Sequence, residues 1–233
     1  MGEGAANNMV QEHFSDSEAV ARYAEGPPRF VPGFFDIHRM ALVLLRERVP
    51  DDGRLLVLGA GGGLELNSFA EQSSGWSFVG IDPSAEMLAL ARTATSTAAE
   101  RIELVQGYIE DAPAGPFDGA TCLLTLHFLD RGERLRILQE IRRRLAPGAP
   151  FIAAHSSFPQ QAEARPLWLE RYRNFAIAGG AEAGDAEHWR RAVEERLTLL
   201  SPEEDEELLR DAGFAGVELF YAAFTWRGWV ACA

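Results

Sequence analysis

The chain has 233 residues, which suits one domain, or one domain with an appended lid, and argues against two independent cores. Hydrophobic residues make up 47% of the sequence, enough for a sizeable core, and this excludes an intrinsically disordered protein. The formal net charge of −13 gives a surface that repels phosphate backbones, so direct nucleic-acid binding is disfavoured.

Cysteine usage and the first residues limit the remaining classes. Cys122 and Cys232 have no metal-ligand spacing and indicate no disulfide framework, so we expect no metal. Residues 1–10 lack the basic start and apolar stretch of a signal peptide, and no apolar run approaches the ~20 residues of a membrane helix. We therefore expect a cytoplasmic protein with no membrane partner. The sequence does not fix the oligomeric state, and a homodimer stays open.

Two helices are expected before the first strand. Ser15 and Glu18 have capping-box spacing and predict a helix over residues 16–24, which the Gly-Pro-Pro run at 26–28 ends. A second helix is expected over residues 35–48, where apolar residues recur on one face.

Strand and helix signals then alternate. Short apolar strands are predicted at 54–58, 76–81, 102–106, 120–124 and 151–154. Helices are predicted at 64–72, from the 82–84 segment to about 93, and at 133–145. Strands joined by helices pair in parallel, and their continuous apolar character suits burial on both faces. The pattern predicts an α/β fold with an open, doubly wound sheet.

The C-terminal part completes this sheet. Residues 155–200 are helical in character and too long for a plain connection, which indicates a lid. Ser201, Pro202 and Glu204 are typical of a helix start, and an antiparallel hairpin is expected from strands at 217–225 and 229–233 with a turn at 226–228. The expected organisation is one domain in four parts. These are N-terminal helices (1–48), a core (49–154), a helical lid (155–200) and a C-terminal helix with a hairpin (201–233).

A glycine cluster follows the first strand. Glycines at 59, 61, 62 and 63 allow positive φ and close approach of a ligand to the backbone, and the next helix points its N-terminal amides at that ligand. In a dinucleotide-binding fingerprint the third glycine stands at the position that Leu64 occupies in this chain. The earlier glycine, Gly63, is typical of proteins that bind S-adenosylmethionine (SAM), and an NAD oxidoreductase is disfavoured. A turn without a ligand is the alternative.

Asp82 ends the second strand, about 20 residues after the glycines. An acidic residue there accepts hydrogen bonds from both ribose hydroxyls of a nucleotide-like ligand. The alternative is a helix N-cap, for which Ser84 competes.

Taken together, these segments resemble class I SAM-dependent methyltransferases. The resemblance rests on the glycine turn and on the segments 79–82, 106–111, 117–119, 124–129 and 145–148. It implies a seven-stranded, mostly parallel sheet with an antiparallel last strand, and SAM as cofactor. It also implies the SAM-binding residues Gly59, Ala60 and Gly61 at the methionine end, Gly63 in the same turn, Asp82 at the ribose, Pro83, Met87, Tyr108 and Ile109 at the adenine, and Leu123 near the methionine.

Two positions depart from the family pattern. The family usually has an acidic residue two positions before the first glycine, where this chain has Val57. At the adenine position the family often has Asp, where this chain has Tyr108. These departures affect how the cofactor is held.

Within this family the chain resembles the carboxy-SAM synthase subgroup of wobble-uridine tRNA modification. The shared segments are 31–34, 125–129 and the C-terminal run from 212 to 231. This resemblance implies that Phe34 lies near SAM and that Arg190 or Arg191 meets the carboxylate of a prephenate-derived group. The subgroup has Tyr where this chain has Phe34, and Asn where it has Leu123.

Candidate substrate and catalytic residues come from the strand ends and the lid. His127 and His155 follow the fourth and fifth strands, and His127 is a candidate general base because an imidazole titrates near neutrality. Tyr23 and His155 are candidate substrate contacts, and Arg190 could recognise a carboxylate. Packing against the sheet, or a solvated helix surface, is the alternative for each.

The sequence therefore predicts a SAM-dependent methyltransferase that acts on a small molecule. In-line displacement from SAM has a good leaving group, so positioning and desolvation can suffice without a strong base. Carboxyl transfer onto SAM from prephenate and a non-catalytic SAM-binding protein are the alternatives.

Overall fold

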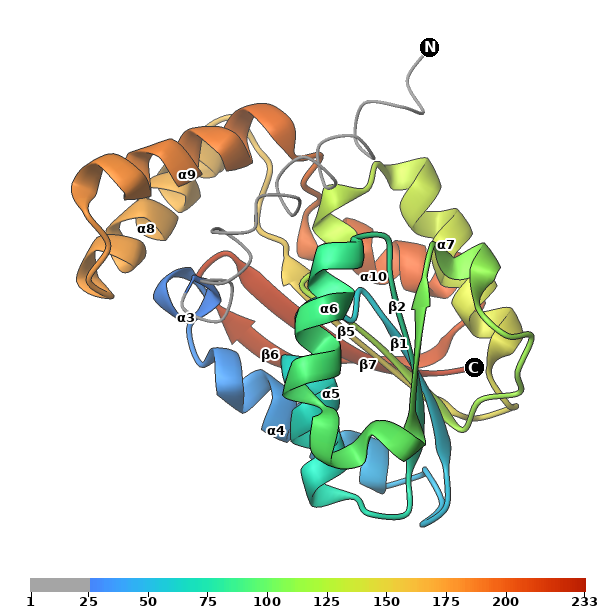
Figure 1. Cartoon of the computed structure of the whole chain (residues 1–233). Coiled ribbons are helices and arrows are strands. Elements are labelled where there is room, and N and C mark those ends of the chain that lie inside the picture. Colours follow the sequence, from blue (N-terminus) through green and yellow to red (C-terminus); the bar gives the residue numbers. More distant parts are fainter. Residues whose placement is uncertain (1–25) are drawn as a thin grey trace.

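The computed structural model describes residues 26–233. The helix predicted at 16–24 and the candidate residue Tyr23 lie outside the described residues. The described part is a central sheet covered by helices on both faces, with two further helices at one end (Figure 1).

One seven-stranded sheet organises the chain, in the order β3-β2-β1-β4-β5-β7-β6. The five strands from β1 to β5 pair in parallel, whereas β7 runs antiparallel to both β5 and β6. The predicted α/β fold with an antiparallel last strand is confirmed. The strands are β1 (Arg54–Leu58), β2 (Ser77–Asp82), β3 (Ile102–Gln106), β4 (Gly119–Leu123), β5 (Pro150–Ser156), β6 (Ala215–Ala223) and β7 (Trp226–Cys232).

Most of the helices follow the predicted ranges with small shifts at their ends, but one was not predicted: it begins at Pro27, within the Gly-Pro-Pro run expected to end a helix, because proline suits the first position of a helix. The helices are α3 (Pro27–Phe30), α4 (Phe34–Arg46), α5 (Leu64–Gln72), α6 (Ala85–Ala94), α7 (Arg131–Arg144), α8 (Ala164–Ala178), α9 (Ala183–Arg196) and α10 (Pro202–Asp211), with 3-10 turns η2 (Ser96–Arg101), η3 (Ile109–Asp111) and η4 (Leu126–Phe128). Side chains fix several starts: Ser84 accepts from the Met87 amide at α6, and Ser201 and Glu204 form the predicted capping box at α10.

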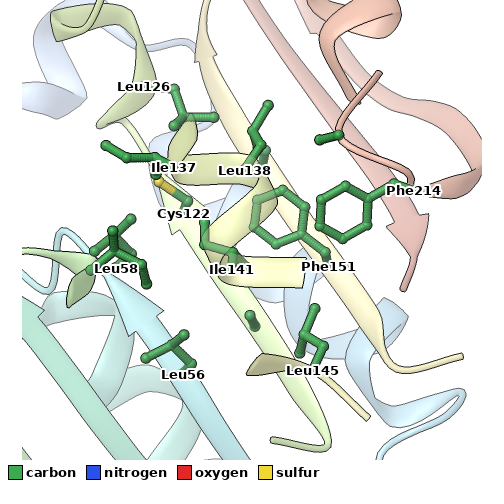
Figure 2. Close-up of a cluster of buried hydrophobic side chains, with 14 of the residues drawn as sticks. Leu56, Leu58, Cys122, Leu126, Ile137, Leu138, Ile141, Leu145, Phe151 and Phe214 are labelled. Carbon is green, nitrogen blue, oxygen red and sulfur yellow. The ribbon is translucent and has the colours of Figure 1, made fainter. Parts of the chain in front are cut away.

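The sheet has two apolar faces because neighbouring residues of a strand point to opposite sides. Leu56 and Leu58 of β1 pack toward α7 and α10, whereas Leu55 and Val57 pack toward α4 and α5. In the first layer, Figure 2 shows α7 side chains over Cys122 of β4, beside the Phe151–Phe214 pair, whose rings stack with centroids 4.9 Å apart. The two apolar layers include Leu58 at the end of β1 and Leu123 at the end of β4. The turn after β1 therefore begins at a well-packed part of the sheet.

The C-terminal hairpin is present, but its predicted turn is wrong. Residues 226–228 belong to β7, and the turn lies at Phe224 and Thr225, where Phe224 has φ of 49°. Gly228 is required for packing within the strand and not for a turn, because a Cβ there would lie 2.8 Å from the Phe220 ring. The Trp226 indole donates to the Phe30 carbonyl at 3.0 Å, which fixes the start of β7.

Helices α8 and α9 occupy the segment predicted to be a lid and lie side by side at one end of the molecule (Figure 1). Phe30 of α3 connects them to the sheet, since its ring contacts Tyr172 of α8, Trp189 of α9 and Trp226 of β7. Within residues 26–233, no helix combines the length and the apolar character needed to span a bilayer.

Candidate functional site

The glycine turn joins β1 to α5 and needs glycine at two positions for different reasons. Gly59 has φ of 76°, and a Cβ there would lie 2.0 Å from the Thr125 hydroxyl oxygen. Gly63 has φ of 81°, and its Cβ would lie 2.7 Å from the Ala91 Cα of α6. A side chain at either position would push the turn away from β4 or from α6.

Asp82 locks this turn to the end of β2. One carboxylate oxygen accepts from the Gly61 amide at 2.9 Å and the other accepts from the Ser84 amide at 3.0 Å. Burial raises the pKa of Asp82, and these two amides oppose the shift. Each oxygen keeps a second lone pair for a ligand hydroxyl. The structure therefore brings together the two motifs that the sequence singled out, and ribose binding by Asp82 stays a prediction.

A narrow pocket opens beside the turn, at the carboxyl ends of β1 and β4. Its lining residues are Phe34, His38, Gly59, Ala60, Gly62, Leu64, Glu65, Leu123 and Leu124. The predicted residues Phe34, Gly59, Ala60 and Leu123 thus meet at one place. Leu124 has φ of 55°, a strained conformation for leucine, and its amide donates to the Ala154 carbonyl at 2.6 Å.

Glu65 and His38 line this pocket and were missed by the sequence analysis. Both are 5% exposed. Burial raises the pKa of Glu65 to about 8, with the Thr121 hydroxyl opposing the shift, and burial lowers the pKa of His38 to about 4. The sequence signal for Glu65 was its place between Leu64 and Leu66 in the first turn of a helix that must pack inward.

The predicted adenine contacts differ in accessibility. Tyr108 is exposed at the start of η3, where its amide donates to Asp111. Met87 and Ile109 are buried, at 2% and 1% exposure, and Ile109 belongs to the core layer beneath α7. Pro83 is half-buried and its carbonyl accepts from the Gln106 amide group. Tyr108 and Pro83 are thus the accessible members of this group.

The candidate histidines lie in the interior. His127 is 5% exposed, with its ring 4.3 Å from that of Phe128 and 5.5 Å from that of Trp226. Burial lowers the pKa of His127 well below its usual value. His155 is 2% exposed, with Nε2 3.2 Å from an Asp205 oxygen. His127 thus packs against β7, and His155 packs against Trp229 of β7 and Asp205 of α10, so their roles as general base and substrate contact stay predictions.

Arg190 and Arg191 of α9 are already paired with carboxylates. The Arg190 guanidinium is 2.6 Å from a Glu194 oxygen and 2.9 Å from a Glu187 oxygen, and these carboxylates raise its pKa. Arg191 also pairs with Glu187, and the Arg171 guanidinium lies over the Trp168 ring. Recognition of a substrate carboxylate by Arg190 would require these contacts to open.

Comparison with known proteins decides the family. Residues 55–148, which run from β1 past the end of α7 and include the glycine turn and Asp82, match the methyltransferase domain family. The chain carries a class I SAM-dependent methyltransferase domain. The match covers this domain, which is that of a SAM-dependent methyltransferase-family enzyme.

Curated relatives extend over most of this methyltransferase chain. It is 23% identical over 209 residues to the carboxy-S-adenosyl-L-methionine synthase of Campylobacter fetus subsp. fetus (strain 82-40), covering 88% of each protein. It is 26% identical over 231 residues to the protein of that name from Pseudomonas putida (strain GB-1), covering 96% of this chain and 94% of the relative.

Solved structures agree on the methyltransferase fold. Human N-acetylserotonin methyltransferase in complex with SAM superposes with a TM-score of 0.64 at 16% identity, covering 94% of this chain and 57% of that one. PigF with SAH gives 0.65 at 19% identity, covering 95% and 61%. The chain thus spans less than two thirds of these two structures. A putative methyltransferase complexed with the Haloferax volcanii Trm112 activator gives 0.65 at 19% identity, covering 96% and 97%.

The residues of this methyltransferase suit its cofactor. SAM presents ribose hydroxyls, a cationic sulfonium and an amino acid end. Asp82 offers carboxylate acceptors beside the exposed Tyr108, and the turn offers backbone within ligand reach. The narrow pocket contains a carboxyl oxygen of Glu65, Oε1, that has no hydrogen-bond partner among the described residues. Among the residues described, no cluster of three or more His, Cys, Asp or Glu side chains could hold a metal ion.

Proposed function

We propose that this enzyme transfers the methyl group of SAM to a small-molecule acceptor. The proposal is carried by the convergence at the carboxyl ends of β1, β2 and β4, where Asp82 is tied to the glycine turn and the narrow pocket opens beside it. Ligands of open α/β sheets bind at this edge, where the strand order reverses between β1 and β4.

The chain's contribution would be to bind and orient the reactants. SAM supplies an activated methyl group on a sulfonium. The turn residues Gly59, Ala60 and Gly61 would hold its amino acid end, and Asp82 would accept from its ribose. Phe34 and Leu123 would give the pocket apolar walls that exclude water. Alignment of two reactants can itself supply several kcal/mol of the barrier.

The acceptor would be small and largely apolar. The side chains joining the lid to the sheet are the aromatic residues Phe30, Tyr172, Trp189 and Trp226. The acidic chain disfavours a nucleic-acid acceptor. A general base at His127 would need the ring to leave its contacts with Phe128 and Trp226, so methyl transfer that relies on alignment suits this interior better.

Carboxyl transfer onto SAM is a second candidate, favoured by the names of the curated relatives and their coverage of most of the chain. The pairing of Arg190 with Glu187 and Glu194 counts against it, because a prephenate-derived carboxylate would have to displace two carboxylates.

Isotope transfer separates these functions. The enzyme is incubated with SAM carrying a deuterated methyl group and a panel of small phenols, amines and thiols, with and without prephenate, and all products are analysed by mass spectrometry. Methyl transfer places the label on an acceptor and yields S-adenosylhomocysteine (SAH). A labelled cofactor that gains a carboxylate only with prephenate would establish the second function. Bound SAM that persists through the panel would support a non-catalytic SAM-binding protein.

A further inference from the structure

We infer that Glu65 binds the α-ammonium group of the cofactor's amino acid end. The inference rests on the proposed cofactor site and adds to it a binding residue from α5. Val57 of β1 stands where the family usually has an acidic residue. Its apolar side chain offers the ammonium no acceptor.

Strand register places the Glu65 carboxyl over Val57. Parallel pairing of β1 and β4 sets Val57 opposite Thr121, so the two side chains share one face of the sheet. The Glu65 carboxyl lies beside the Thr121 hydroxyl on that face. The carboxyl therefore reaches, from the first turn of α5, the space above the last residues of β1.

The glycine turn makes this reach possible. Gly63 has φ of 81° and lies against the Ala91 backbone of α6, so the start of α5 packs closely against α6. Leu66 and Phe69 of α5 are fully buried, so the helix is held against the β1 face. Glu65 precedes Leu66 in the first turn of α5 and is buried with it.

Among the described residues that line the pocket, none gives this carboxyl a cationic partner. Glu65 is 5% exposed, its Oε1 atom has no hydrogen-bond partner among residues 26–233, and no arginine lines the pocket. His38, the remaining basic side chain of the lining, is kept neutral by burial, which lowers its pKa. A buried carboxyl in this state costs free energy.

A primary ammonium is the group that suits this acceptor. It carries three donors and a positive charge, and the cofactor brings it together with a carboxylate that the amides of a helix start can attract. Hydrogen bonds that involve charged groups are the stronger ones, and in a water-excluded pocket the attraction is enhanced.

The test pairs a change in the protein with a change in the ligand. Binding of SAH and of its analogue without the amino group, 5′-S-(3-carboxypropyl)-5′-thioadenosine, is measured by calorimetry with the wild-type protein and with Glu65→Gln. We expect Glu65→Gln to weaken SAH binding about 10- to 100-fold, the usual effect of losing a charged hydrogen bond. We expect the wild type to lose a similar factor for the analogue, and the variant to bind both ligands equally.

Two controls keep the result specific. Glu71→Gln changes an exposed glutamate of the same helix and is expected to leave both affinities unchanged. Val57→Asp combined with Glu65→Gln returns one carboxyl to the same face of the sheet and is expected to recover SAH binding, with folding checked by circular dichroism.

The inference is overturned if Glu65→Gln binds SAH as tightly as the wild type. It is also overturned if the variant loses as much affinity for the analogue, relative to SAH, as the wild type does. Wild-type protein that binds neither ligand would overturn the cofactor site as well. Tight SAH binding without methyl transfer to any acceptor would instead reject the proposed function and leave Glu65 in place.

Discussion

Arg134 of α7 and Asp205 of α10 form an ion pair in the protein interior, with 2.5 Å between nitrogen and oxygen and side chains 1% and 2% exposed. Although burial opposes ionisation, His155 and Arg134 lower the pKa of Asp205. Arg134 also donates to the carbonyls of Leu129 and Thr198. One guanidinium thus connects the loop after β4, the segment after α9, and α10.

Asp205→Asn should destabilise the fold strongly, because it leaves the Arg134 charge buried without its counter-ion. We expect a loss of about 3 to 5 kcal/mol in the free energy of unfolding, measured by chemical denaturation. Replacing both partners, as Arg134→Met with Asp205→Leu, should recover much of that loss. The exposed pair of Asp36 with Arg39 gives the control: Asp36→Asn should change stability by less than about 1 kcal/mol. Equal effects of the two Asp→Asn variants would contradict a buried, fully desolvated pair.

Gly59→Ala should damage both stability and cofactor binding. Its Cβ would meet the Thr125 hydroxyl at 2.0 Å in a backbone conformation that alanine rarely adopts. Gly148→Ala is the matched control, because Gly148 has φ of 77° and a Cβ there would meet no atom within 4 Å. The control should cost about 1 to 2 kcal/mol from conformation alone, a fall in Tm of roughly 2 to 8 °C.

For Gly59→Ala the fall in Tm should be larger than for Gly148→Ala, and SAH binding by calorimetry should weaken at least about tenfold. Gly148→Ala should leave SAH affinity unchanged, because residue 148 lies between α7 and β5, after the turn that ends α7. Unchanged SAH binding by Gly59→Ala would show that the turn is not the methionine-end contact.

Much of this fold could be predicted from sequence because its signals are local. The apolar run at 54–58 and the glycines after it fix β1, the turn and the start of α5 within a few residues. The turn of the C-terminal hairpin could not be predicted, because Gly228 looks like turn punctuation until Phe220 is seen packing against it.

The glycine turn and Asp82 of the candidate site could be predicted from sequence, whereas the buried side chains around them could not. Gly59 and Asp82 carry their own pattern, and the structure joins them. Glu65 appears as an ordinary helix glutamate in the sequence, and its burial follows from the register of β1 with β4 and the packing of Leu66. The burial of His127 likewise depends on Trp226, about a hundred residues further along the chain, which local patterns do not reveal.

Stability should depend on pH through Glu65. Its pKa of about 8 in the folded protein exceeds the ordinary value of 4.5, so the folded state binds the proton more tightly than the unfolded state. The protonated Glu65 carboxyl therefore stabilises the folded state fully below pH 4.5, and this stabilisation is lost as the pH rises through about 8. The pKa of His38 is lowered, which has the opposite effect between about pH 4 and 6.5. The window from pH 6.5 to 8 separates the effect of Glu65 from that of His38.

In that window the wild type should lose about 2 kcal/mol in the free energy of unfolding relative to Glu65→Gln, which cannot ionise. Denaturation curves at several pH values check this difference. Parallel pH profiles for the two proteins would mean that Glu65 ionises as freely in the folded state as in the unfolded state.

Cofactor binding should release a proton if Glu65 receives the α-ammonium group. At pH 7 the carboxyl is mostly protonated, because its pKa is about 8, and contact with a cation favours the ionised form. The other groups facing it would not mask the effect. Thr121 does not titrate, His38 is neutral at this pH, and burial raises the pKa of the Cys122 thiol far above it.

Calorimetry of SAH binding in buffers of different ionisation enthalpy measures the number of protons released. We expect about one proton for the wild type at pH 7, where Glu65 is protonated before binding and the amino group of SAH is already an ammonium. Glu65→Gln should release none at pH 7, whereas Glu71→Gln should match the wild type. Asp82 serves as the internal comparison: its carboxylate accepts from two amides in the free protein, and Asp82→Asn should weaken binding without removing the proton release. Release that persists in Glu65→Gln would assign the proton to another group and contradict the role given to Glu65.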